Sequence, residues 1–297
     1  MAESGLIIVD KPGEWTSHDV VARMRRLAGT RRVGHAGTLD PMATGVLVVG
    51  VEKATRLLGH LTLTEKVYEA TIRLGVTTNT DDAEGEVTAV ASAAGVTPEG
   101  IGKGVEALTG AIMQVPPQVS AIKVNGQRAY KKARAGEEVE LAARPVTVRA
   151  FDVLDVRPAG DGAGGGAGDV IDVDAVVTCS SGTYIRSLAR DLGAALGVGG
   201  HLTRLRRTRV GPYDLSQART LDQLAEECVI LPIGEAVAAA FPRRDVTAEE
   251  ARIIGHGGRL PAAGLGQGPI GVFGPDGALL ALVEEQGRTA RPLAVFV

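Results

Sequence analysis

Asp40 is the residue whose type and setting first suggest chemistry. It stands in Thr38-Leu-Asp-Pro41, within a segment from 34 to 43 that follows neither the helical nor the strand period. An ionised carboxylate can act as a covalent catalyst that divides one difficult step into easier ones. Taken alone, however, an aspartate before proline is more typical of a turn. The segment therefore predicts an ordered loop, and the role of Asp40 depends on its surroundings.

The remaining polar residues do not have the spacing of a metal or nucleotide site. Cys179 and Cys228 lie far apart, and the five histidines form no HxxxH or Cys-His group. The glycine-rich stretch 160–168 contains GxGxxG spacing, but an alternating strand-like run follows it where dinucleotide binding requires a helix. We expect no metal, no cofactor and no disulfide framework, and we interpret the stretch as the tip of a hairpin.

Positive charge is clustered although the net charge is −3. A single cluster is more typical of a solvated helix face, but three clusters with the acids elsewhere favour contacts with phosphates. Asp191 is the one acid within the second of them. The clusters are Arg23, Arg25, Arg26, Arg31 and Arg32; Arg186, Arg190, Arg204, Arg206, Arg207 and Arg209; and Lys123, Arg128, Lys131, Lys132 and Arg134.

Strand and helix patterns must position these residues. They alternate without the regular period of a doubly wound sheet, which predicts an α+β domain. Ser17 is the expected N-cap of the first helix, and Thr97-Pro98 opens the second. The expected strands are 5–9, 45–50, 66–74, 145–156 and 170–177, and the expected helices run from 17 to about 29, from 97 to about 108 and from 183 to 196.

A chain of 297 residues exceeds the size at which a single core stops growing, so we expect two domains. We place the boundary between residues 240 and 241. Beyond it, Thr247-Ala-Glu-Glu250 is a capping box, and short strands follow at 269–273, 278–283 and 292–297. This pattern predicts a small β-rich domain, 241–297, after a larger domain, 1–240.

Six blocks of sequence resemble the TruB family of pseudouridine synthases. The most specific is Gly34-His-Ala-Gly-Thr-Leu-Asp-Pro-Met-Ala-Thr-Gly-Val-Leu47, which is similar to the family's nucleophile loop. The others are Lys11-Pro-Gly-Glu-Trp-Thr-Ser17, Lys66-Val-Tyr68, Pro116-Pro-Gln-Val-Ser-Ala121, Gly182-Thr-Tyr-Ile-Arg186 and His201-Leu-Thr-Arg-Leu-Arg206. The resemblance implies the pseudouridine synthase fold, with a mixed, largely antiparallel central sheet. The C-terminal segment resembles a PUA-like RNA-binding domain more loosely, through Val246-Thr-Ala-Glu-Glu-Ala251 and His256-Gly-Gly.

The resemblance assigns three catalytic residues. Asp40 is the implied nucleophile, and Arg186 is the cation that keeps it ionised. An arginine in the first turn of a helix opposes the helix dipole, which independently favours a specific partner for Arg186. Tyr184 is the implied assistant in removing the C5 proton. Two departures from the family pattern, the glycine-rich stretch and an arginine at position 204 where an aromatic is frequent, do not touch the nucleophile.

Six further residues are expected to contact RNA. The resemblance places His35 beside the displaced base pairing of the T loop, Tyr68 stacked on the target base, and Leu205 in the base pocket. Each also has an ordinary structural reading as a loop histidine, a strand tyrosine or a core leucine. Lys11 is either structural or directed at a phosphate. Arg206 and Arg207 are expected to bind phosphates.

The implied function is isomerisation of uridine 55 in the tRNA T loop to pseudouridine, with the target base flipped and no cofactor. We expect a monomeric cytoplasmic enzyme without an obligatory protein partner. No apolar run approaches the roughly 20 residues of a membrane-spanning helix, and the acidic N-terminus leads directly into a strand-length run.

Two alternatives remain open. A guide-RNA-dependent pseudouridine synthase shares the catalytic blocks, although Tyr130-Lys-Lys-Ala-Arg-Ala-Gly136 and the absence of a basic tail favour the stand-alone form. A tRNA-binding folding chaperone would need the basic clusters but not Asp40. The joint presence of Asp40, Tyr184 and Arg186 favours an enzyme.

Overall fold

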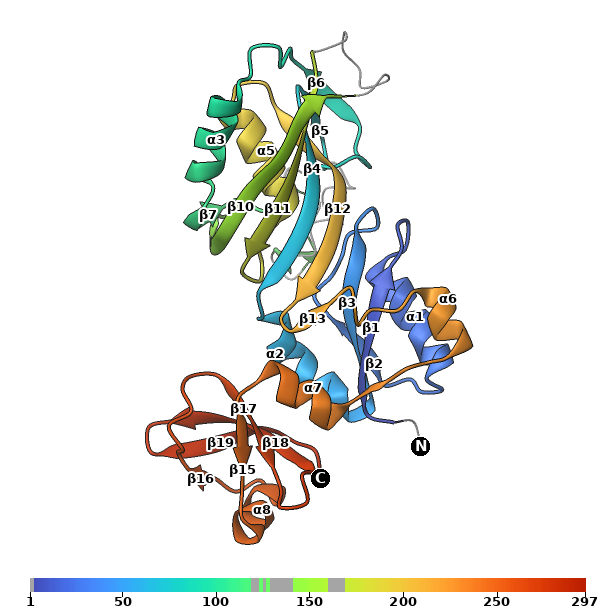
Figure 1. The fold of residues 1–297 in the computed structure, drawn as a ribbon, viewed down its shortest axis with the longest axis vertical. Helices are drawn as coiled ribbons and strands as arrows, with labels where there is room; N and C mark the ends of the chain where they lie inside the picture. Colours follow the sequence, from blue (N-terminus) through green and yellow to red (C-terminus); the bar gives the residue numbers. More distant parts are fainter. Residues whose placement is uncertain (1–2, 119–122, 125–126, 129–140, 160–168) are drawn as a thin grey trace. The chain divides into compact units, whose positions relative to one another are not determined.

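The structure, a computed structural model, describes residues 3–118, 123–124, 127–128, 141–159 and 169–297 (Figure 1). The chain forms two compact units. The first unit contains Met1–Pro41, Gly45–Thr64 and Arg209–Val297, and the second contains Met42–Thr44 and Glu65–Thr208. The glycine-rich stretch 160–168, the segment 130–136 and the basic residues Lys131, Lys132 and Arg134 lie outside the described residues.

The first unit is built on an antiparallel sheet of apolar strands. β1 (Gly5–Lys11) pairs with β3 (Thr44–Val51), and β2 (Val33–Ala36) and β14 (Leu231–Pro232) extend this sheet. Almost every residue of β1 and β3 is buried, which explains their continuous apolar runs. β2 was expected to be part of the loop 34–43; pairing with β3 recruits it as a strand.

α1 (Ser17–Leu27) leads from the first strand toward β2. Its N-cap is Thr16 rather than the expected Ser17, because the hydroxyl of Thr16 accepts the backbone N–H of Asp19 while the Asp19 carboxylate accepts that of Thr16. The side chain of Ser17 is thereby released for a different bond. Val20, Val21 and Met24 form the buried face of the helix.

The C-terminal segment packs with these N-terminal elements in one core. Leu6, Val46, Phe273 and Phe296 belong to a single buried cluster. The short elements around it are η1 (Glu52–Leu57), α2 (Leu58–Thr62), β13 (Tyr213–Asp214), α6 (Leu221–Glu226) and α7 (Ile233–Ala240). Arg56 also donates to the backbone oxygen of Val295, at 2.6 Å.

The C-terminal segment has its own five-stranded sheet, in the order β15-β17-β18-β19-β16. Its helix begins at the predicted capping box of Thr247 and Glu250, and a second apolar cluster fills its interior. The strands and helix are β15 (Arg243–Asp245), α8 (Ala248–Gly255), β16 (Leu260–Pro261), β17 (Pro269–Phe273), β18 (Leu279–Gln286) and β19 (Thr289–Val295).

The second unit contains a sheet in the order β12-β4-β11-β10-β7. The pairings β4–β11, β11–β10 and β10–β7 are antiparallel. The strands are β4 (Lys66–Leu74), β7 (Gly110–Gln114), β10 (Arg144–Pro158), β11 (Ile171–Cys179) and β12 (Gly200–Val210). The unit also contains two small hairpins, β5 (Val76–Thr78) with β6 (Val87–Val90) and β8 (Lys123–Val124) with β9 (Gln127–Arg128).

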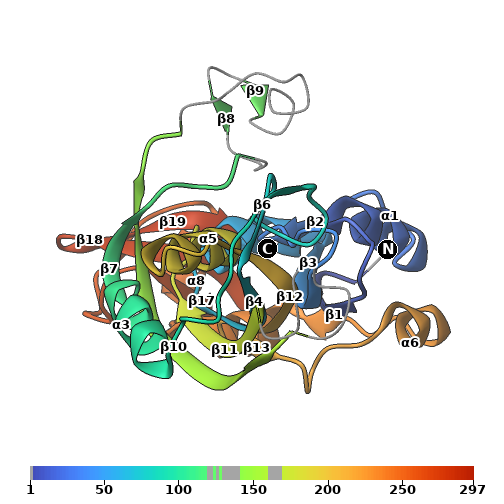
Figure 2. The ribbon, with the colours of Figure 1, turned by 90° about the horizontal axis from the view of Figure 1, so that it is seen from above.

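Two helices pack on this sheet. α3 (Pro98–Ala107) contacts β10, and α5 (Ile185–Ala195) contacts α3 and β4 (Figure 2). The apolar face of α5 is buried together with alternate residues of β11, as a strand covered on one face requires. The predicted α+β class with a largely antiparallel central sheet is confirmed. β12 was not predicted, because its apolar residues are interrupted by arginines.

A buried histidine at the start of β12 leads to a prediction about stability. His201 is 5% exposed, its Nδ1 lies 2.8 Å from the oxygen of Val76, and burial lowers its pKa below the ordinary 6.5. Below pH 6.5 the unfolded chain therefore binds a proton that the folded chain does not. The free energy of unfolding should decrease as the pH is lowered below 6.5, by up to about 1.4 kcal/mol per pH unit. In urea titrations between pH 7 and 5, His201→Gln should flatten this dependence.

The control for this experiment is His256→Gln, which changes an exposed histidine. It should keep the wild-type pH dependence. A His201→Gln curve parallel to that of the wild type would contradict the prediction.

Candidate active site

Asp40 lies half-buried at the end of a loop whose backbone is held on both sides. On one side, the Ser17 hydroxyl donates to the oxygen of Leu39 at 3.1 Å and accepts its N–H at 2.9 Å. On the other side, the ammonium of Lys11 donates to the oxygen of Pro41 at 3.1 Å. The loop predicted from the sequence is thus ordered around Asp40.

Lys11 does not occupy the phosphate-facing position that was one of its two expected roles. It is fully buried, and its ammonium also donates to the oxygens of Pro12 and Trp15, at 2.8 and 2.6 Å. A buried ammonium must satisfy its donors within the protein, and three carbonyl oxygens do so here. The structure therefore favours the structural role for Lys11.

His35 is half-buried on β2, in the same unit as Asp40. Its ring packs edge-to-face against the exposed His18 at the start of α1, with 5.7 Å between the ring centroids. His18 was not singled out from the sequence. The contact places the exposed ring of His18 directly beside His35.

Tyr68 and Tyr184 belong to the second unit. Tyr68 lies on β4 and is 7% exposed, whereas Tyr184 is half-buried and is the N-cap residue of α5. The backbone of Tyr184 is held by Gln114, whose side-chain oxygen accepts its N–H at 2.8 Å and whose side-chain nitrogen donates to its oxygen at 3.1 Å. The helix that carries Arg186 is thereby fixed at its first turn.

Arg186 forms a buried ion pair with Asp82. The two side chains are 5% and 3% exposed, with 3.2 Å between the guanidinium and the carboxylate, and Arg186 also donates to the oxygen of Thr80 at 2.9 Å. Asp82 in turn accepts from the Thr80 hydroxyl and from the N–H of Glu84. Two buried opposite charges with additional hydrogen bonds hold the guanidinium in one orientation.

A second acid–arginine pair lies beside the first. Arg190, one helical turn after Arg186, lies 3.1 Å from the carboxylate of Asp81 and donates to the oxygen of Val115 at 2.8 Å. Asp81 has a φ of 60°, in the left-handed region, and its burial raises the pKa of its carboxyl above the ordinary value although Arg190 opposes this. Adjacent acids and arginines four residues apart form one network around the turn at 80–85.

The predicted contacts on β12 differ in accessibility. Leu205 is 6% exposed, Arg206 is half-buried with a 3.3 Å bond to the Thr44 hydroxyl, and Arg207 is 1% exposed. The pKa of the buried Lys66 is lowered to about 8, first by its burial and second by the positive charge of the nearby Arg207. Arg206 is accessible enough for the expected phosphate contact, whereas Arg207 is too deeply buried to reach a phosphate at the surface.

Sequence reasoning missed Asp82 and Gln114. Asp82 resembled an ordinary turn acid because Asp81, Asp82 and Gly85 are typical turn residues. The sequence did contain a signal for its partner: two adjacent acids, Asp81 and Asp82, could pair with two arginines spaced one helical turn apart, at 186 and 190. Gln114 carried no signal, because its function depends on the chain returning to it about 70 residues later, at Tyr184.

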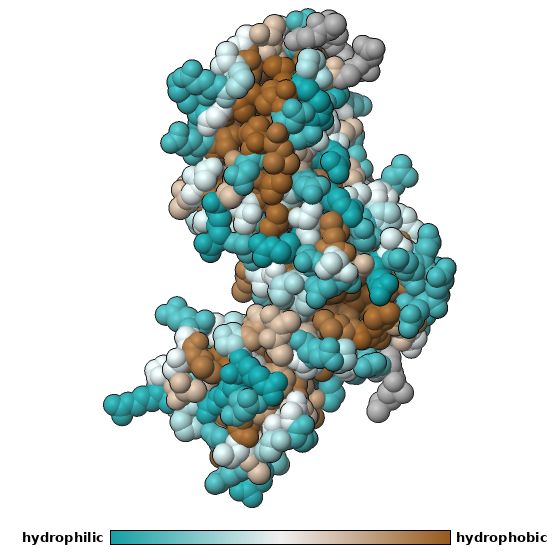
Figure 3. Space-filling model, in the orientation of Figure 1, coloured by the Kyte–Doolittle hydropathy of each residue, from teal (hydrophilic) through white to brown (hydrophobic). Residues whose placement is uncertain are grey.

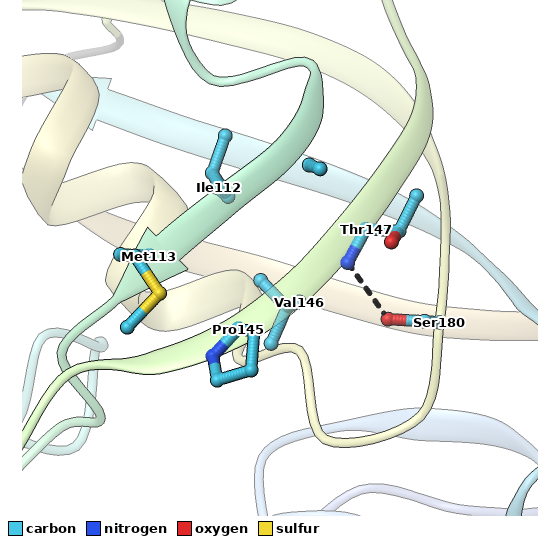
Figure 4. Close-up of a pocket in the computed structure, with 7 residues that line it drawn as sticks. Ile112, Met113, Pro145, Val146, Thr147 and Ser180 are labelled. Atoms are coloured by element: carbon cyan, nitrogen blue, oxygen red, sulfur yellow. Dashed lines mark hydrogen bonds between the residues drawn. The ribbon is translucent and has the colours of Figure 1, made fainter.

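A shallow pocket in the second unit is separate from these residues. It has a volume of about 250 Å³ and lies between β7 and β10, with Ser180 at its rim (Figure 4). The Ser180 hydroxyl accepts the N–H of Thr147 at 2.9 Å. Its lining contains no acid or base that could catalyse a reaction. Figure 3 shows further apolar surface on this unit. Leu154 on β10 is 65% exposed.

Among the residues that the structure describes, no three or more histidine, cysteine or acidic side chains group as a metal site would require. Within the same part of the chain, no helix has both the length and the apolar character needed to cross a membrane.

Comparison with protein families matches three parts of the chain. Residues 25–185 match the N-terminal domain of the TruB family pseudouridylate synthases. Residues 186–237 match a tRNA pseudouridylate synthase B C-terminal domain, and residues 241–297 match the C-terminal part of tRNA pseudouridine synthase II. Both the region of Asp40 and the C-terminal sheet are thus covered by models of this family.

Relatives and solved structures agree with these matches. A tRNA pseudouridine synthase B from Thermobifida fusca is 65% identical, with 98% of each chain covered, and one from Streptomyces griseus is 62% identical, with 98% of this chain and 97% of the relative covered. A Cbf5-Nop10-Gar1 complex contains a similar chain with a TM-score of 0.74 and 28% identity, covering 99% of this chain and 85% of that one.

The fold, the site and these similarities define the class of protein as a pseudouridine-forming enzyme. The chain belongs to the TruB family of pseudouridylate synthases.

Proposed function

We propose that the chain converts uridine 55 in the T loop of tRNA to pseudouridine, with Asp40 as the nucleophile. Pseudouridylation of tRNA is supported by near-full-length identity of 65% and 62% to enzymes named tRNA pseudouridine synthase B. The observation that carries the role of Asp40 is its loop, which the buried side chains of Ser17 and Lys11 hold on both sides. Such preorganisation is expected of a group that must meet a reacting atom.

The reaction is an isomerisation and consumes no co-reactant. The bond from C1′ of the ribose to N1 of the uracil breaks, the base rotates, and a bond forms from C1′ to C5. C5 then loses a proton, and N1 gains one, so that atoms and charge balance. In this scheme Asp40 acts on the sugar or the base as a covalent catalyst, Arg186 stabilises its ionised form, and Tyr184 assists removal of the C5 proton.

Access to the uracil requires that the base leave its stack. Flipping costs a few kcal/mol, and stacking on an aromatic side chain returns about 1–3 kcal/mol. Tyr68 is the proposed stacking residue, with Leu205 in the base pocket and His35 at the displaced T-loop pairing. His18 packs against His35 and would therefore lie next to the RNA at this proposed contact.

Residues 1–240 are proposed to form the catalytic domain and 241–297 a PUA-like RNA-binding domain. The separate sheet and apolar cluster of the C-terminal segment support this division.

On α1, Arg25 and Arg26 are exposed and can reach phosphates. We propose a monomeric cytoplasmic enzyme that acts without a guide RNA, since identity is far higher to the tRNA pseudouridine synthases B than to the Cbf5 chain.

The test is incubation with an unmodified tRNA transcript, followed by carbodiimide mapping of pseudouridine. Modification should appear at position 55 without added metal, nucleotide or guide RNA, and EDTA should not reduce it. A requirement for guide RNA would favour the guide-dependent alternative. Tight tRNA binding without any pseudouridine would favour the folding chaperone.

The salt dependence of binding should separate the two neighbouring arginines. Each phosphate contact adds about −0.7 to −0.9 to the slope of log affinity against log salt. Arg206→Ala should therefore flatten the slope by about one, whereas Arg207→Ala should leave the slope unchanged and lower Tm, because Arg207 is buried. Filter-binding titrations and thermal melts would measure both. Equal flattening by both variants would contradict the prediction.

A further inference from the structure

Ser17 is a buried polar residue whose hydroxyl bonds the loop that carries Asp40. Its side chain is 1% exposed, and its hydroxyl bonds both backbone groups of Leu39, itself 3% exposed and adjacent to Asp40. The helix start fixes Ser17, because the Thr16–Asp19 capping box holds the turn in which it stands. One hydroxyl therefore satisfies a buried donor and a buried acceptor beside the proposed nucleophile.

Gln114 makes the equivalent arrangement in the second unit. Its side chain is 2% exposed, and its amide bonds both the N–H and the oxygen of Tyr184. Only one orientation of the amide satisfies both groups, so the geometry defines which end donates. Tyr184 begins α5 and has no side-chain cap, so Gln114 anchors the turn that carries Tyr184 and Arg186.

The hydrogen bonds of Ser17 and Gln114 join their side chains to backbone groups, so these bonds give neither residue a direct chemical role on the uracil. What they control is where the neighbouring side chains project. Catalysis is sensitive to this, since a misplacement of about 1 Å can cost roughly 100-fold in rate. By contrast, the loss of one hydrogen bond elsewhere in the fold mainly lowers stability.

We propose that Ser17 and Gln114 are positioning residues for the isomerisation: Ser17 orients Asp40, and Gln114 orients Tyr184 and Arg186. This inference rests on the proposed function of those three residues. It requires that loss of either side-chain clasp reduce the chemical step while leaving tRNA binding largely unchanged.

Single-turnover rates at saturating enzyme, tRNA Kd and Tm should be measured for Ser17→Ala and Gln114→Ala. We expect rates about 10- to 100-fold lower and Kd within about threefold of wild type. Ser17→Cys, with a weaker hydrogen-bonding group, should be intermediate. These assays are to be run well below each variant's Tm, so that the unfolded fraction does not contribute.

Gln114→Glu provides a readout that a loss of packing would not give. An ionised carboxylate can accept the N–H of Tyr184 but cannot donate to its oxygen, whereas a protonated carboxyl can do both. Burial disfavours the ionised carboxylate and so raises the pKa of the carboxyl, and lowering the pH then increases the protonated fraction. The rate of Gln114→Glu relative to wild type should therefore rise as pH falls from 8 to 6.

Matched controls remove hydrogen bonds of the same kind away from the site. Tyr213→Phe removes a buried hydroxyl that donates to the oxygen of Ala236 at 2.8 Å in the first unit. Thr71→Val removes a buried hydroxyl that donates to the carboxylate of Asp174 at 2.6 Å in the second unit. Both should lower Tm and leave the single-turnover rate within twofold.

Each residue is judged separately. A folded Ser17→Ala or Gln114→Ala enzyme with a rate within twofold of wild type overturns the proposal for that residue, as does a rate loss equal to that of its control. If an alanine variant does not fold, Ser17→Cys and Gln114→Glu decide by the same criteria. Activity of Asp40→Asn would instead refute the proposed function itself, whatever these variants show.

Discussion

Replacing Asp40 with asparagine should reduce isomerisation by at least about 1,000-fold while leaving tRNA Kd within a few fold. The substitution removes the ionisable carboxylate but preserves the shape of the side chain, so a covalent role is lost and binding surfaces are kept. The bonds of Ser17 and Lys11 to the flanking backbone do not involve the Asp40 side chain, so the loop should remain ordered. Single-turnover assays and filter binding would measure both effects.

The matched control is Asp222→Asn, the same chemical change at an exposed position on α6. It should leave rate and affinity unchanged. Near-normal turnover by Asp40→Asn would exclude Asp40 as the nucleophile, and a large loss of affinity would indicate a role in holding RNA instead.

Removing Arg186 should affect both stability and chemistry. Arg186→Ala leaves the Asp82 carboxylate buried without its ion-pair partner, which costs about 3–5 kcal/mol. The single-turnover rate should fall by at least about 100-fold, because the proposed stabilisation of ionised Asp40 is lost. Affinity for tRNA should change little, since a side chain 5% exposed is not a phosphate contact.

The double variant Arg186→Ala with Asp82→Asn separates these effects. Stability should recover in part, because no buried charge remains unpaired, whereas the rate should stay low. Arg157→Ala, which breaks a partly exposed ion pair with Asp174 in the same unit, should change stability by less than about 1 kcal/mol and leave the rate unchanged. Recovery of the rate in the double variant would contradict a direct role for Arg186.

Local patterns predicted the elements that carry the site. The alternation of residues 66–74 and the capping signals at Thr97 and Thr247 correspond to β4, α3 and α8. These predictions succeeded because periodicity and capping depend on residues close in sequence. The N-cap of α1 was misplaced by one residue, because Thr16 forms the reciprocal capping box with Asp19 while Ser17 bonds the distant Leu39 instead.

The sequence by itself determined the α+β class, the motif around Asp40 and the likeness to the TruB family, because these reside in contiguous residues. Only the tertiary structure decided that Lys11 and Arg207 are buried, that Arg186 pairs with Asp82, and that Ser17 and Gln114 clasp the backbone of residues far along the chain. The physical reason is that burial and hydrogen-bond partners depend on which distant segments meet. A lysine or arginine in sequence carries the same charge whether it ends at a phosphate or inside the protein.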